Sequence, residues 1–320
     1  MATVFLDGAF VSAGDARVSA FDAGFQHGVG LFETLLALRH APADAPGYTR
    51  LSGSGGVLHL GEHLDRLAAS SRALGLLETI RVDALHQAVV RACDRAFIDQ
   101  PNAARLRVRL TITGGDLNML DRGKAREHAP TLMIAATPAS VYPRDLLTRG
   151  ASVVLADLRL NPLDPLQGHK SLSYWGRLRE LQRASTVGAG EALVLQVSNH
   201  LAGGCVSNAF LVRDGVLITP IARGEETLDQ KEAKGNTFLP SPVLPGIARR
   251  WVMDVAAARN LEVQRKMIAI GDVLDADELF LTNSSWGVLP VVRVEAKPLG
   301  SGEVGPVSRS LVEAWAALAP

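Results

Sequence analysis

The sequence has little cysteine, no excess of either charge and no long apolar run. Cys93 and Cys205 are too few for the disulfide framework of a secreted domain, and they predict a reducing compartment such as the cytoplasm. The 33 basic and 33 acidic residues give no net charge, which argues against a nucleic-acid partner. No apolar run reaches the length of a membrane span and the N-terminus lacks the basic segment of a signal peptide, so we expect no membrane contact.

Two phosphate-binding motifs are also missing. No GxGxxG follows a predicted strand, which argues against a Rossmann fold. The glycine-rich segment within residues 40–57 lacks the Lys-Ser/Thr of a P-loop, so we interpret those residues as a plain loop. His59, Glu62 and His63 match an H-x-x-E-H metal pattern, but no third ligand is evident and we expect no metal.

Apolar periodicity predicts both strands and helices. Residues 105–112 alternate between apolar side chains and arginine or threonine, which is typical of a strand. We further predict strands at 4–8, 131–136, 153–156 and 192–195, a hairpin turn at Asp214-Gly215, and helices at 64–74, 85–96, 172–185, after Pro245 and at 308–318. Because these elements mix without a strict βαβ rhythm, we predict an α+β fold in two domains, 1–138 and 150–320, connected by 139–149.

Lys170 lies between a loop rich in proline and aspartate, Asn161–Pro165, and the helix predicted over 172–185. A lysine amine condenses with an aldehyde to form a Schiff base, and desolvation lowers its pKa enough to make it a base. A single lysine near a helix end is more often solvated, so the surrounding sequence has to decide between the two interpretations.

Six segments, in order, resemble the class IV (fold-type IV) pyridoxal-phosphate enzymes, which include branched-chain aminotransferases, D-amino acid aminotransferases and 4-amino-4-deoxychorismate lyases. They are Gly24–Thr34, Glu62–Leu67, His169–Tyr174, Ser207–Pro220, Leu244–Arg249 and Leu281–Val291. The resemblance covers nearly the whole chain. It implies a small N-terminal α/β domain, a larger C-terminal domain with a barrel-like sheet, pyridoxal 5'-phosphate as cofactor, and a homodimer with the cofactor between the domains.

The resemblance also implies roles for individual residues. Lys170 would carry the cofactor as a Schiff base and shuttle the substrate α-proton. Arg66 would bind the phosphate, because a guanidinium offers a planar fork that fits its oxygens. Ile247 and Ala248 would offer N–H groups at a helix start, although Ala248 lacks the threonine hydroxyl common in the family. The remaining cofactor-side residues are Gly203, Ser207, Asn208 and Ser284.

Substrate contacts are expected from the strand at 105–112 and from two further positions. Arg105 and Arg107 project from one strand face, and Arg107 best matches the family residue that binds a substrate carboxylate. Phe32 stands where the family places an aromatic residue beside the cofactor, and Ser285 follows the last cofactor turn. His27 and His169 can line the same pocket, although a lone histidine is more often structural.

Gly203 departs from the family, which has a glutamate there that pairs with the pyridine nitrogen and keeps it protonated. Without that carboxylate the pyridine ring is a weaker electron sink, which favours the lyase hypothesis relative to the aminotransferase hypothesis. Three functions therefore stay open. They are an aminotransferase moving an amino group to a 2-oxo acid, a lyase releasing pyruvate from 4-amino-4-deoxychorismate to give 4-aminobenzoate, and a non-catalytic paralogue. Retention of Lys170 and Arg66 argues against the last.

Overall fold

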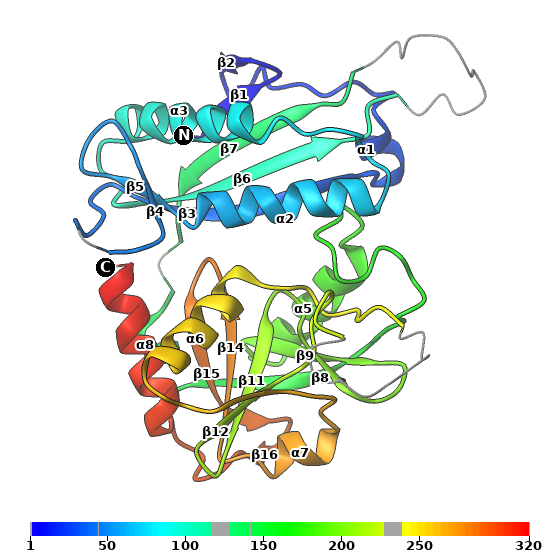
Figure 1. Cartoon of the computed structure of the whole chain (residues 1–320), viewed down its shortest axis with the longest axis vertical. Coiled ribbons are helices and arrows are strands. Elements are labelled where there is room, and N and C mark those ends of the chain that lie inside the picture. The colour runs from blue at the N-terminus through cyan, green and yellow to red at the C-terminus, as the bar shows by residue number, and fades with distance from the viewer. Residues whose placement is uncertain (1, 44, 117–128, 141, 227–238, 320) are drawn as a thin grey trace. The chain divides into compact units, whose positions relative to one another are not determined.

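The computed structural model (Figure 1) describes residues 2–43, 45–116, 129–140, 142–226 and 239–319. The chain divides into two compact units. Unit 1 comprises Met1–Val141, His169–Ser173 and Ala319, and unit 2 comprises Tyr142–Gly168, Tyr174–Leu318 and Pro320. The short segment around Lys170 thus belongs to the first unit although it lies far along the sequence. The domain limits proposed from the sequence stay a prediction.

Unit 1 is built on one seven-stranded sheet in which every pair of neighbouring strands is antiparallel. The strand order is β2-β1-β7-β6-β3-β5-β4. The strands are β1 (Thr3–Leu6), β2 (Ala9–Val11), β3 (Gly30–Leu38), β4 (Tyr48–Arg50), β5 (Gly56–Leu58), β6 (Arg105–Thr113) and β7 (Leu132–Pro138), and the helices are α1 (Ala23–His27), α2 (Leu60–Ala73) and α3 (Val82–Asp99). The prediction of a plain loop over 40–57 was wrong, because β4 and the start of β5 lie there and pair with each other.

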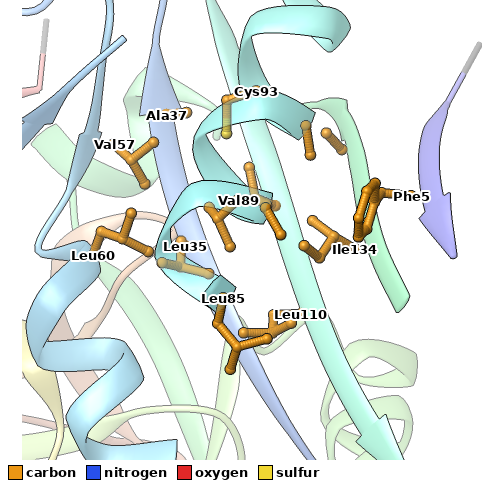
Figure 2. Close-up of a cluster of buried hydrophobic side chains, with 14 of the residues drawn as sticks. Phe5, Leu35, Ala37, Val57, Leu60, Leu85, Val89, Cys93, Leu110 and Ile134 are labelled. Atoms are coloured by element: carbon orange, nitrogen blue, oxygen red, sulfur yellow. The ribbon is translucent and has the colours of Figure 1, made fainter. Parts of the chain in front are cut away.

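The alternation predicted for residues 105–112 is confirmed. Leu106, Val108 and Leu110 are fully buried in one core cluster with side chains of α2 and α3, whereas Arg107 is exposed. Figure 2 shows Leu110 among the residues of this cluster, together with Leu35 of β3. Since burying such an aliphatic side chain contributes about 1.5–3 kcal/mol, this face anchors the helices, and the arginine face is left for other contacts.

The Lys170 segment extends the unit 1 sheet along the edge of β3. The Phe32 N–H donates to the Lys170 carbonyl at 2.9 Å, and the Leu172 N–H donates to the Gly30 carbonyl at 2.9 Å. Leu31 and Ser171 form an antiparallel bridge between these bonds. The prediction of a helix from Leu172 was wrong, because the main chain there is hydrogen-bonded to the edge of the sheet. The helix α5 begins only at Trp175 and runs over Trp175–Thr186.

Unit 2 contains a nine-stranded sheet that curls into a half-barrel. Its order is β10-β9-β8-β15-β14-β11-β12-β13, with β16 paired to β15, and the β8/β9, β8/β15 and β12/β13 pairs are parallel. The strands are β8 (Ala151–Leu160), β9 (Glu191–Gln196), β10 (Leu201–Gly204), β11 (Asn208–Arg213), β12 (Val216–Thr219), β13 (Val263–Arg265), β14 (Glu278–Asn283), β15 (Gly287–Val294) and β16 (Lys297–Pro298). Besides α5, the helices are α4 (Arg144–Thr148), α6 (Ile247–Ala258), α7 (Ile270–Leu274) and α8 (Pro306–Leu318). The predicted α+β fold with a barrel-like sheet in the larger part is confirmed.

Two local predictions in unit 2 are also confirmed. Residues Asp214 and Gly215 form the two-residue turn between β11 and β12, with φ values of 51° and 77°. Such a pair of positive φ angles matches the twist of a tight hairpin. The helix predicted after Pro245 is α6.

None of the helices in the described ranges is long and apolar enough to cross a membrane.

Helix α6 covers one face of the β11–β14 pair (Figure 1). Phe210 and Phe280 stack on that face with ring centroids 5.1 Å apart, and both belong to a core cluster with Val252 and Ala256 of α6. The first turn of α6 reaches Asn208 at the start of β11, because a Cβ at Gly246 would lie only 1.9 Å from the Asn208 Oδ1. Packing therefore places the start of α6 over the ends of β11 and β14.

Candidate active site

Lys170 lies against an aromatic ring in unit 1. Its Nζ is 4.6 Å from the centroid of the Phe32 ring, and the Cζ of Arg109 is 3.8 Å from the same centroid. The face of an aromatic ring attracts a cation, so both charged groups lie against the Phe32 ring. The main-chain bonds to Gly30 and Phe32 fix the strand that carries Lys170. The main chain that carries the amine is therefore fixed to the edge of the sheet.

Glu33, the neighbour of Phe32 on β3, is buried under α2. Its carboxylate accepts hydrogen bonds from the Arg66 Nε at 2.8 Å and Nη2 at 2.5 Å, and His63 Nδ1 lies 2.7 Å from Glu33 Oε2. The exposed fractions of the Arg66 and Glu33 side chains are 10% and 2%. Adjacent strand residues point to opposite faces, so Phe32 and Glu33 belong to different sides of the sheet.

Glu33, His63 and Arg66 form a triad whose charges are set by burial and by one another. Burial alone raises the pKa of Glu33, but the positive charge of Arg66 and the hydrogen bonds from His63 and Arg66 outweigh it and lower that pKa to about 2. Burial lowers the pKa of His63 below its usual value, and the hydrogen bond to Glu33 opposes this only in part. Glu33 is therefore a carboxylate, and a neutral His63 donates its Nδ1–H to it. The triad holds the Arg66 guanidinium in one orientation on α2.

Of the three arginines on β6, Arg109 lies against the Phe32 ring, which Lys170 also contacts. Arg107 is exposed, and Arg105 lies near Tyr48. Burial raises the pKa of Tyr48 to about 12, although the charge of Arg105 opposes the rise. Sequence reasoning named Arg105 and Arg107 and missed Arg109. Its position two residues further along the same strand face was the available signal.

In unit 2, the start of α6 offers N–H groups to an anion. The first intrahelical bond runs from the Arg250 N–H to the Gly246 carbonyl at 3.0 Å, so the N–H groups of Ile247 and Ala248 have no partner within the helix. Among the described residues, no side chain caps this helix at Gly246. Asn208 lies directly beneath Gly246 and donates from Nδ2 to the Leu244 carbonyl at 2.8 Å.

The turn that contains Ser284 and Ser285 is shaped by Asn283. Its Oδ1 accepts hydrogen bonds from the Ser285 N–H at 2.9 Å and the Trp286 N–H at 3.0 Å. The turn follows β14, whose residues pair with those of β11, including Asn208. Ser284 and Ser285 thus follow the strand next to the one that begins with Asn208.

The loop after Gly203 is held by a buried acid that sequence reasoning missed. Glu191 accepts hydrogen bonds from the N–H groups of Cys205 and Val206 and from the Ser207 hydroxyl, at 3.1–3.2 Å. Burial raises its pKa, and these hydrogen bonds oppose the rise. Gly203 has a φ of 145°, and a Cβ there would lie 2.7 Å from the Ser207 carbonyl oxygen. This backbone favours glycine at 203 over the glutamate that the family resemblance implies at this position.

The histidines noted in the sequence have separate environments. His59 Nδ1 lies 2.7 Å from Glu62 Oε1, His63 contacts Glu33, and His169 Nδ1 lies 2.9 Å from the Ser70 hydroxyl. His27 is exposed in the last turn of α1. Within the described part of the chain, no three His, Cys, Asp or Glu residues are grouped to hold a metal ion.

Comparison with known proteins identifies the family. The amino-transferase class IV profile matches residues 30–294. A putative branched-chain-amino-acid aminotransferase of Methanocaldococcus jannaschii is 28% identical over 97% of this chain and 94% of its own, and a D-alanine aminotransferase of Staphylococcus aureus is 26% identical over 98% and 97%.

Two solved structures share the fold. The branched-chain amino acid aminotransferase of Escherichia coli has a TM-score of 0.79 and 24% identity, with 99% of this chain and 94% of that chain covered. The 4-amino-4-deoxychorismate lyase of Pseudomonas aeruginosa has a TM-score of 0.73 and 25% identity, with 97% of each chain covered. Since the profile spans most of its length, the chain belongs to the class IV aminotransferases, a family of enzymes that use pyridoxal 5'-phosphate.

Proposed function

We propose that this enzyme is a pyridoxal-phosphate-dependent aminotransferase that moves an amino group between an amino acid and a 2-oxo acid, with Lys170 as the residue that binds the cofactor covalently. The observation that carries the proposal is the position of the Lys170 amine, 4.6 Å from the Phe32 ring centroid on a segment bonded to β3. A primary amine held in this way is the group that an aldehyde cofactor needs.

The residues present fit such a cofactor. The start of α6, with no side-chain cap among the described residues, suits a phosphate, because free N–H groups and the helix dipole favour an anion. We assign the phosphate to Ile247, Ala248, Ser284 and Arg66, and the ring side to Gly203, Ser207 and Asn208. Glu33 supports the assignment of Arg66, because a bidentate partner fixes the direction of the guanidinium.

Each residue then has a defined task. When bound, pyridoxal phosphate withdraws electrons from the substrate α-carbon and accepts its amino group. Lys170 Nζ removes the proton from that carbon and returns a proton later in the cycle. Arg109 binds a substrate carboxylate with its planar fork, assisted by Arg105 or Arg107, while Ser285 completes the substrate side. Phe32 covers the amine and keeps water from it.

The covalent link is tested by reduction and peptide mapping. We expect the purified protein to absorb in the visible range, and borohydride to attach the cofactor permanently to the peptide that contains Lys170. K170A should lose both signals, whereas K266A, which removes an exposed lysine of unit 2, should keep them. A label on another lysine, or colour that survives in K170A, would contradict the proposal.

A second candidate is the lyase reaction, in which pyruvate leaves 4-amino-4-deoxychorismate and 4-aminobenzoate forms. Two observations favour it, namely the likeness to the solved lyase and the glycine at 203, which leaves that position without a carboxylate. The two reactions are separated by their products. Incubation with L-leucine or D-alanine and 2-oxoglutarate should yield glutamate if the protein is an aminotransferase, whereas 4-aminobenzoate from aminodeoxychorismate would identify the lyase.

We further propose a homodimer in the cytoplasm, with domains at 1–138 and 150–320 joined by 139–149. Family resemblance supports the dimer, and the low cysteine count supports the compartment. Light scattering on the purified protein tests the dimer, and a monomer at micromolar concentration would contradict it. Limited proteolysis tests the domain limits, because exposed connections are cut first.

A further inference from the structure

Thr282 carries a buried hydroxyl for which the described residues supply no hydrogen bond. The residue is 1% exposed, in β14. Among the described residues, its Oγ1 has no hydrogen-bond partner. A buried hydroxyl without a partner costs about 1–3 kcal/mol. An ordered water, an ion or a ligand supplies the missing partner of such a group, and the surroundings decide which.

The direction of this side chain follows from strand register. Thr282 pairs with Asn208 of β11 and with Val288 of β15, and residues opposite one another in an antiparallel pair project to the same face. The same face carries Phe210 and Phe280, which pack against α6. Thr282 therefore lies on the α6 side of the sheet, beside Asn208, whose amide contacts Gly246.

The first turn of α6 is fixed above this position. Arg249, 1% exposed, donates from Nη1 and Nη2 to the two oxygens of Glu225 at 2.8 Å, and from Nη2 to the Pro220 carbonyl at 3.0 Å. Its Nε donates to the Thr219 hydroxyl at 3.1 Å. These bonds tie the start of the 12-residue helix to the end of β12, so its N–H groups are preorganised.

We propose that the Thr282 hydroxyl is an additional phosphate-binding group, which donates its hydrogen bond to the anion held at the start of α6. The proposal deepens the proposed function and rests on it. Ala248 brings no side-chain donor to this helix start, and Thr282 supplies one from the sheet beneath. A hydrogen bond from a hydroxyl to a charged phosphate oxygen is stronger than one between neutral groups. Such a bond would offset the free-energy cost of burying the Thr282 hydroxyl without a partner among the described residues.

The test compares T282V with T282S and with a matched control. Valine keeps the shape of threonine and removes the hydroxyl, whereas serine keeps the hydroxyl. T111V is the control, because Thr111 is also a buried threonine whose Oγ1 has no partner among the described residues, but it lies in β6 of unit 1. For each full-length protein, equilibrium dialysis measures the affinity for pyridoxal 5'-phosphate and for pyridoxal, which lacks the phosphate.

We expect T282V to bind pyridoxal 5'-phosphate about ten-fold more weakly, with unchanged affinity for pyridoxal. T282S and T111V should keep the wild-type affinity for both compounds. Thermal unfolding of cofactor-free T282V should occur at or above the wild-type temperature, because the unpaired hydroxyl is gone. Inorganic phosphate should stabilise the wild type more than T282V.

Three results would overturn the proposal. They are an unchanged pyridoxal-phosphate affinity in T282V, an equal loss of affinity for both compounds, and a lowered unfolding temperature of the cofactor-free variant. The first means that the hydroxyl holds only a buried water, and the others mean a structural role. If the wild-type protein binds no pyridoxal phosphate, the proposed function itself fails, which is a different result from failure of the Thr282 assignment.

Discussion

Glu33 and Arg66 form a bidentate ion pair beneath α2, with bonds of 2.8 and 2.5 Å and little exposure of either side chain. The pair joins β3, which also carries Phe32, to the helix whose arginine we assign to the cofactor phosphate. A buried charge that loses its partner is costly, so the pair links stability to the geometry of the site.

Removing the Glu33 charge should therefore destabilise the protein strongly. We expect E33Q to lower the free energy of unfolding by about 3–5 kcal/mol, because Arg66 is left as a buried cation without its partner. Urea unfolding followed by circular dichroism measures the change. R95Q, which removes an exposed pair with Asp99, is the control and should cost less than about 1 kcal/mol. Equal losses in the two variants would contradict the role of burial.

The same triad predicts how stability depends on pH. The pKa of Glu33 is about 2 in the folded protein against an ordinary value of 4.5, so its contribution is complete above pH 4.5 and is lost as pH falls toward 2. That contribution is about 3 kcal/mol. The pKa of His63 is also lowered from its ordinary value of 6.5, so its contribution to stability begins to decrease as the pH falls below 6.5. Urea midpoints from pH 7 to pH 3 should decline in both windows, and in E33Q the decline below pH 4.5 should be smaller.

Arg109 should matter more than Arg107 for substrate binding. We expect R109Q to raise the KM for the amino-acid substrate about ten-fold or more with a smaller change in kcat, because a charge-assisted bond to a carboxylate is lost. Steady-state kinetics of R109Q and R107Q decide between the two positions. A larger effect at Arg107 would support the sequence-based assignment and contradict the one drawn from the Phe32 ring.

Gly203 should not accept the glutamate that the family resemblance implies at this position. We expect G203A and G203E to lower the free energy of unfolding by more than about 2 kcal/mol, since a Cβ would lie 2.7 Å from the Ser207 carbonyl oxygen. Gly215 is the matched control, because it also has a positive φ but meets no atom within 4 Å of an added Cβ. G215A should cost only about 1 kcal/mol, as an αL residue in a turn. A stable G203E that binds the cofactor more tightly would contradict this account.

Much of the fold could be predicted because its signals are local. The alternation along 105–112, the Asp214-Gly215 turn and the helix after Pro245 each depend on a few consecutive residues. The helix predicted from Leu172 failed for the opposite reason. The Leu172 N–H donates to the Gly30 carbonyl, and the Lys170 carbonyl two residues before accepts from the Phe32 N–H, so partners more than a hundred positions earlier in the chain fix this segment as a strand.

The sequence by itself was enough to predict the family and the cofactor class, which the comparisons confirm, and to propose Lys170, because these depend on side-chain chemistry in ordered motifs. Only the tertiary structure decided which arginine of β6 lies against the Phe32 ring, that Glu33 holds Arg66, and that the buried Thr282 hydroxyl has no partner among the described residues. The physical reason is that side-chain pairing and desolvation depend on strands and helices that are distant in sequence. A local sequence pattern does not specify which distant residue a side chain will contact.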